Sequence, residues 1–202
     1  DYANTKIEML YGLFNEVQVG FSRESFKKTY NLHVKYGIKR QTNNFPVSVV
    51  GYNSINLDTS LDENVYPNLN YNERYVYISQ LLISRRFSDK FSLQLSPSVI
   101  KHNFLTTQAE TDYNYVLNTG SRLKISKRSS FNIDYSYHLN RLKNSSEKNV
   151  LSLGIDMETG GHVFQLLFSN TQASDEAGVL TGAEGDWLKG DVYFGFNILR
   201  VF

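Results

Sequence analysis

Apolar and polar residues alternate along almost the whole chain. Segment 131–139 is the clearest case, because every second residue from Phe131 onward is apolar or aromatic and the residues between them are polar. Segment 32–39 repeats the pattern. A period of two residues is typical of a strand with two different faces, and no segment shows the 3.6-residue period of a helix. The pattern therefore predicts an all-β protein.

The stretch 152–170 predicts a β-hairpin. Gly160-Gly161 suits a two-residue turn, because both central positions need a positive φ, which glycine adopts without steric strain. Folding the chain there pairs apolar residues on one face, namely Met157 with Phe164, Ile155 with Leu166 and Leu153 with Phe168. Asp156 and Gln165 meet on the other face. Whether this apolar face packs against a protein core or against lipid decides between a soluble and a membrane β-fold.

Eleven strands of roughly ten residues are predicted. Their expected ranges are 3–13, 16–25, 29–40, 45–57, 74–86, 91–104, 113–126, 130–141, 149–158, 162–172 and 191–202. The connections alternate in length, so short turns would gather at one end of the sheet, the tight rim, and longer polar loops at the other, the loop rim. The longest loops are 58–73 and 171–190.

Tilted strands of about 9–11 residues cross the hydrocarbon layer of a bilayer, and short turns on one rim are typical of outer-membrane barrels. We therefore expect a transmembrane antiparallel up-and-down β-barrel with its apolar face toward lipid. The lipid-facing side chains would include Phe131, Ile133, Tyr135, Leu153, Ile155, Phe164, Leu166 and Phe196. The polar lumen would include Lys6, Glu8, His33, Lys35, Arg122, Lys124, Asp134, His138 and Asp156.

A soluble β-barrel or sandwich that binds a ligand is the alternative, and it would turn the same apolar faces inward. A soluble barrel with this many strands would enclose a bore too wide for side chains to fill. Strand length and number thus favour the membrane barrel.

An odd strand number predicts that the chain does not close its own barrel. With eleven strands, 3–13 and 191–202 run in the same direction, whereas single-chain bacterial barrels have an even number. We expect a twelfth strand, contributed by residues upstream of Asp1, so that 1–202 is one barrel domain lacking its first strand.

Composition excludes several other classes. The formal net charge is +1 and no basic stripe occurs, which argues against nucleic acid as a partner. No run of about 18 apolar residues is present, so helical membrane spans are not expected. The chain has no cysteine and hence no disulfide framework or thiolate metal site.

The last strand carries a family resemblance. Phe194, Phe196 and Ile198 share a face, and the chain ends on Phe202, which is similar to the aromatic-ended last strand of bacterial outer-membrane barrels. The stretches 81–103, 157–170 and 190–202 resemble a bacterial membrane-bound β-barrel family of unknown function. The resemblance implies a Gram-negative outer-membrane location. The expected partners of such a barrel are membrane lipids, and other outer-membrane or periplasmic proteins are candidates. It implies no activity and no functional residues.

Catalytic and metal motifs are not evident. The four histidines, at 33, 102, 138 and 162, show no ligand spacing, so no metal or other cofactor is expected. Asp134 and His138 are four residues apart on one strand, about 13 Å, which is too far for acid–base contact. Arg122 is expected to lie directly or diagonally opposite Asp134 on the next strand, within reach of an ion pair. The leading interpretation is a non-enzymatic barrel that acts as a narrow channel or as a membrane anchor within a larger assembly, and an outer-membrane hydrolase is the third candidate.

Sidedness is testable by proteolysis. Because long loops of such barrels face outward, protease added to intact cells should cut within 58–73 or 173–190. Cleavage confined to 40–44 or 87–90, measured by mass spectrometry of the fragments, would mean that the orientation is reversed.

The assignment of faces is testable by arginine substitution. Tyr135→Arg or Ile155→Arg would place a charge in lipid, at about 2–4 kcal/mol near mid-bilayer. Ser136→Arg, on the lumen face, should be milder in a membrane-folding assay.

Overall fold

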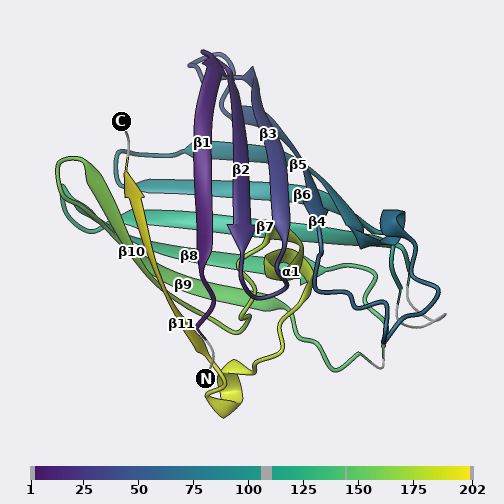
Figure 1. The fold of residues 1–202 in the computed structure, drawn as a ribbon. Coiled ribbons are helices and arrows are strands. Elements are labelled where there is room, and N and C mark those ends of the chain that lie inside the picture. Colours follow the sequence, from purple (N-terminus) through teal and green to yellow (C-terminus); the bar gives the residue numbers. More distant parts are fainter. Residues whose placement is uncertain (1–2, 106–110, 144, 201–202) are drawn as a thin grey trace.

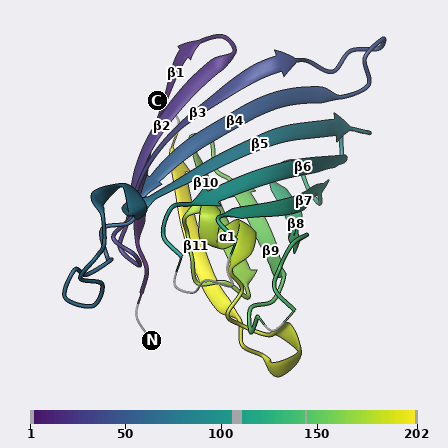
Figure 2. The same ribbon diagram turned by 90° about the vertical axis from the view of Figure 1, so that its right-hand side faces the viewer.

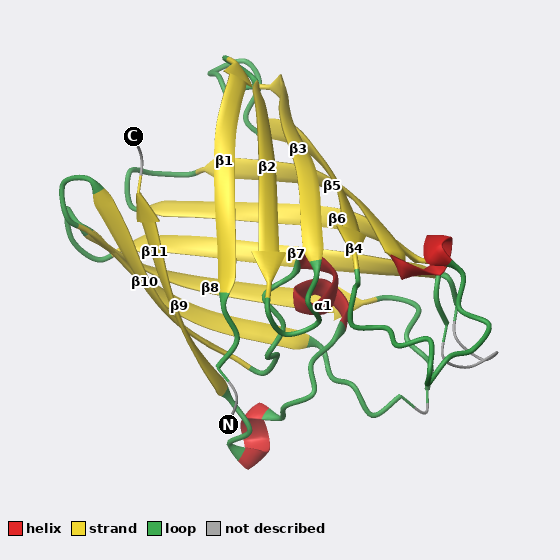
Figure 3. Ribbon diagram, viewed as in Figure 1, coloured by secondary structure: helices red, strands yellow, loops and turns green. Residues whose placement is uncertain are grey.

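Eleven strands form one antiparallel sheet in the computed structural model, which describes residues 3–105, 111–143 and 145–200 (Figures 1 and 3). Each strand pairs with the next along the chain, in the order β1 to β11, as the sequence predicts. The strands are β1 (Lys6–Phe14), β2 (Val17–Glu24), β3 (Tyr30–Lys39), β4 (Ser48–Leu57), β5 (Tyr75–Arg86), β6 (Phe91–His102), β7 (Tyr113–Lys124), β8 (Ser129–His138), β9 (Val150–Glu158), β10 (His162–Ser169) and β11 (Tyr193–Arg200).

The β9–β10 hairpin has the predicted register. Met157 pairs with Phe164, Ile155 with Leu166, and Asp156 with Gln165. The expectation for the turn was wrong in one respect, because only Gly160 has a positive φ, of 67°, and Gly161 does not. This is the pattern of a type II′ turn, in which the first central residue alone needs that conformation.

The connections alternate between short and long, and the helices lie in the long ones. The connections after β1, β5, β7 and β9 are short turns, whereas those after β4 and β10 are long. Among the described residues, three short helices lie in these loop-rim connections: η1 (Tyr71–Arg74), α1 (Glu176–Thr181) and η2 (Trp187–Lys189). The sequence pattern did not predict them. Within the described ranges, no helix has the length and apolar character needed to span a membrane.

The burial pattern of the sheet is the reverse of that in a soluble protein. Its curved inner face buries mainly polar side chains, among them Ser22, Asn31, His33, Ser54, Ser96, Asn118, Ser130, Ser136 and Asp156. The opposite face is apolar and open, so that Tyr135 is 38% and Ile155 41% exposed. Alternation along each strand produces both faces at once, because successive side chains point to opposite sides. The predicted lumen residues lie on the inner face and the predicted lipid-facing residues on the outer face; contact of the outer face with lipid stays a prediction.

β1 and β11 are the two ends of the sheet and do not pair with each other over the described residues. The expectation that these strands leave the barrel unclosed is confirmed. Since antiparallel pairing alternates through eleven strands, β1 and β11 run in the same direction, from the loop rim to the tight rim. A single strand pairing with both would have to run the opposite way, and the twelfth strand stays a prediction.

Ser136 is an unsuitable control for the arginine test, because it is fully buried and accepts a hydrogen bond from Asn118 Nδ2 at 2.9 Å. An arginine there would have to displace packed neighbours, so steric strain would be added to any effect of the charge. Adjacent positions on β10 give a better pair. Leu166 lies on the outer face, whereas Gln165 lies on the inner face and donates to Asp156 Oδ1 at 3.0 Å.

We expect Leu166→Arg to destabilise the membrane-inserted barrel by about 2–4 kcal/mol, because it places a charge in hydrocarbon. Gln165→Arg should be tolerated, since its guanidinium would lie beside the Asp156 carboxylate. Urea unfolding in lipid vesicles measures both variants. Equal losses would contradict the assignment of the two faces.

Candidate functional site

The interior of the curved sheet is occupied by part of the β10–β11 connection. Figure 2 shows α1 inside the curve of the strands. Ala177 and Leu180 of α1 are buried against Ile78, Ile100 and Val116, which are apolar residues on the otherwise polar inner face. Burial of a leucine side chain contributes about 1.5–3 kcal/mol. We call residues 171–185, which contain α1, the plug.

α1 forms because its first turn is capped. The Asp175 side chain accepts from the backbone N–H of Gly178 at 3.0 Å, which satisfies one of the free donors at the helix start. At the other end the Thr181 hydroxyl donates to the Ala177 carbonyl at 2.7 Å. Six residues make a helix too short to be stable alone, so its contacts with the barrel wall stabilise it.

One side of the plug is bonded to β1, β2 and β3. The Lys6 ammonium lies 3.4 Å from Glu176 Oε1, and Asn31 Nδ2 donates to Glu176 Oε2 at 3.2 Å. The backbone N–H of Ser174 donates to Glu24 Oε1 at 2.8 Å. Asn4, just before β1, donates to the Ser174 hydroxyl at 2.9 Å. Charged and polar groups thus hold this side of the plug.

The other side is bonded to the β8–β9 connection. Arg141 Nη2 donates to the Thr181 carbonyl at 3.0 Å, and the backbone N–H of Lys148 donates to the Ala183 carbonyl at 2.9 Å. Burial lowers the pKa of the Arg141 guanidinium, although the nearby Glu147 carboxylate acts in the opposite direction. Together with its contacts to β5, β7, β8 and β9, this anchors α1 to the wall opposite β1–β3. The plug therefore crosses the interior near the loop rim.

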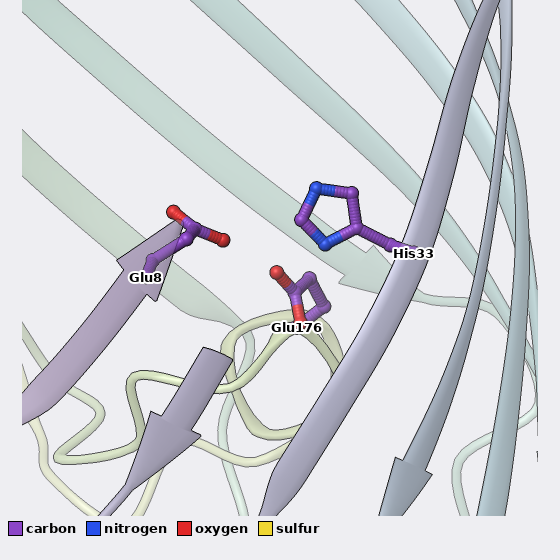
Figure 4. Close-up of side chains that lie close together, drawn as sticks. All are labelled: Glu8, His33 and Glu176. Carbon is purple, nitrogen blue, oxygen red and sulfur yellow. The ribbon is translucent and has the colours of Figure 1, made fainter. Parts of the chain in front are cut away.

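Glu8, His33 and Glu176 come together between the plug and the wall. They lie on β1, β3 and α1, and Figure 4 shows their side chains directed toward one another. One ligand-type atom of each lies within 4.8 Å of those of the other two. Lys6 is 3.7 Å from Glu8 Oε1, so its ammonium joins both carboxylates.

Asn31 orients this cluster. Its Oδ1 lies 2.8 Å from His33 Nδ1, and its Nδ2 donates to Glu176. Because an amide oxygen only accepts, Nδ1 of His33 must carry the proton, which leaves the lone pair on Nε2. The remaining imidazole nitrogen of His33 is therefore a potential ligand atom.

The predicted diagonal placement of Arg122 and Asp134 is confirmed, but the expected ion pair between them is wrong. Arg122 lies opposite Asn132, with Asp134 one diagonal step away opposite Gly120. Arg122 instead donates to Ser130 Oγ at 2.9 Å and forms an ion pair with Glu158 at 3.3 Å. Asp134 accepts from Asn118 Nδ2 at 2.7 Å. The expectation considered only the neighbouring strand β8 and therefore did not include Glu158 of β9.

The other predicted lumen residues do not gather into a site. His138 Nε2 lies 3.0 Å from Asn114 Oδ1, a wall contact rather than a contact with Asp134. Asp156 bonds to Gln165 and Ser130. Lys35 lines a hollow of about 340 Å³ toward the tight rim, and Lys124 ends β7 as an exposed side chain. The chemistry is concentrated at the plug.

Sequence reasoning treated 171–190 as a loop and therefore missed Glu176. The sequence did contain a signal for a helix. Asp175 is a typical N-cap residue, and the apolar residues Ala177 and Leu180 follow it at helical spacing. The fold of the plug also narrows the cleavage expected in 173–190, since most of 171–185 is shielded while Leu188 is 98% exposed. Cleavage in this loop is expected at 188–190.

Comparison with known proteins gives one family. A family model described as "Membrane bound beta barrel domain (DUF5777)" matches residues 1–202. No curated protein and no solved structure matches the chain.

Proposed function

Because the chain belongs to this family of membrane-bound β-barrel domains, we propose that it spans the bacterial outer membrane as a barrel closed by its own plug. In this proposal it acts as a membrane anchor and not as an open pore or an enzyme. The soluble alternative lacks support, since the family is membrane-bound and the buried face of the sheet is mainly polar.

A single observation carries the proposal: the plug is bonded to both sides of the interior. Glu176 contacts Lys6 and Asn31 on one side, while Thr181 and Ala183 accept from Arg141 and Lys148 on the other. Side chains of the wall alone do not fill the bore of a barrel with this many strands. A helix fastened across it supplies the missing atoms and obstructs the path of ions.

The outer membrane is supported by the architecture. Antiparallel barrels with short turns on one rim and long loops on the other are characteristic of that membrane. The non-enzymatic role is supported by the surroundings of His138, which bonds to the Asn114 amide and does not contact Asp134. An amide is not a nucleophile that a histidine base could activate.

Conductance in planar bilayers tests the closed barrel. We expect the unmodified protein to insert without steady conductance. Leu180→Asp should produce steady conductance, because a carboxylate would replace a leucine that is 5% exposed against Ile78, Ile100 and Val116. Burying such a charge without a partner is strongly unfavourable, so the plug should leave its seat.

Leu188→Asp is the matched control. It introduces the same charge in the same connection, at a leucine that is 98% exposed, and should leave the conductance unchanged. Steady conductance of the unmodified protein would contradict the anchor and favour a channel. A second variant replaces residues 173–183 with glycine and serine. If neither this variant nor Leu180→Asp conducts, the plug is not the element that closes the barrel.

A further inference from the structure

We propose that Glu8, His33 and Glu176 bind a divalent transition-metal ion of the zinc class, which fastens the plug to the barrel wall. The site itself rests on the geometry of these three side chains. Its effect on conductance rests on the proposed function of the plug.

The ligand set and its positions fit such an ion. One imidazole nitrogen and two carboxylate oxygens are common zinc ligands, and each of the three atoms lies within 4.8 Å of the other two. In a tetrahedral site with metal bonds of about 2.0–2.2 Å, ligand atoms are about 3.3 Å apart. The ligand atoms would have to move closer together to reach that spacing. Glu8 can do so by a change of rotamer, because its side chain is exposed.

The cluster has the supporting hydrogen bonds that metal ligands need. Asn31 contacts both His33 and Glu176, and it is 3% exposed, so its own position is fixed by its surroundings. A histidine ligand is generally oriented by a hydrogen bond from its second nitrogen to an acceptor. Asn31 provides that acceptor for Nδ1 of His33. Nε2, which lies against Gly20 of β2, carries the lone pair and would bind the metal once the imidazole ring turns toward the two carboxylates.

Buried polar atoms without partners surround the cluster. Ser54 Oγ and Asn56 Nδ2 are buried on β4 and make no hydrogen bond to any described residue, and the same holds for Glu24 Oε2 on β2. Ser54 pairs with His33 and Asn56 with Asn31 in the β3–β4 register. These residues are only 2–3% exposed. Unsatisfied polar groups at such depth indicate a bound water or ion, and water completing a metal's coordination would serve them.

Lys6 is the competitor for the metal. Its ammonium lies 3.4 Å from Glu176 and 3.7 Å from Glu8, so it holds the two carboxylates together and balances part of their charge. A divalent ion would bind the same oxygens, and Lys6 would have to move away from them. Removal of the Lys6 charge should therefore strengthen metal binding, an effect opposite to that of losing a structural residue.

The test uses the full chain folded in detergent micelles, with Zn²⁺ followed by calorimetry and Co²⁺ by its visible absorption. We expect one equivalent to bind, His33→Ala and Glu176→Gln to weaken binding at least tenfold, and Asn31→Ala to weaken it about 10–100-fold. Lys6→Gln should strengthen it. His162→Ala is the matched control, since His162 lies on the outer face at the tight rim, and it should bind as the unmodified protein does.

Folding of each variant is checked by the heat-dependent shift of the barrel band in gel electrophoresis. Absence of saturable Zn²⁺ binding by the unmodified protein would overturn the site, as would equal binding by folded His33→Ala or Glu176→Gln. If His33→Ala fails to fold, Glu176→Gln and Lys6→Gln decide the question. Weakening by Lys6→Gln would also count against the proposal.

The two proposals fail separately. If Zn²⁺ binds as expected but the unmodified protein conducts steadily, the metal site stands and the closed barrel does not. If the barrel is silent and Leu180→Asp opens it, while no variant binds Zn²⁺ or Co²⁺, the plug stands and the metal site is rejected.

Discussion

The backbone hydrogen bonds between neighbouring strands are the constraint on which the rest of the structure depends. Inside a bilayer no water is available to N–H and C=O groups, so a chain without long apolar helices crosses only as a sheet whose strands pair with one another. β2 through β10 meet this requirement on both sides, because each pairs with two neighbours. β1 and β11 meet it on one side only. The unpaired N–H and C=O groups on their other edges are the reason to expect a further strand between them.

Pairing also determines what the interior contains. Once the apolar side of each strand is committed to the outside, the alternation of side chains leaves Ser, Asn, His, Asp and Glu facing inward. Such a face has no general attraction for a helix. The plug is held instead by a small apolar seat, formed by Ile78, Ile100 and Val116, and by specific polar contacts such as those of Glu176 and Arg141. The apolar exceptions on the inner face thus mark where the plug packs.

The strands and their register were predictable from the sequence, whereas the plug was not. Phe131–His138 and the two arms around Gly160 show a strict period of two, and local turns fix their pairing, so Ile155 meets Leu166 as expected. Contacts across the interior carry no such period. Lys6, Asn31 and Glu176 lie far apart in the sequence and meet only because the sheet curves. The Arg122 error has the same origin, because Glu158 reaches it from the second strand away.

The plug is covalently joined to the barrel at both ends, and this limits how far it can move. Six residues, 170–175, separate the end of β10 from α1, and a fully extended chain of that length spans only about 20 Å. A displaced α1 would therefore remain near the mouth of the barrel at a high effective concentration. Its return would be a first-order event, independent of how much protein the membrane holds, so any opening would be brief unless another molecule occupied the vacated seat.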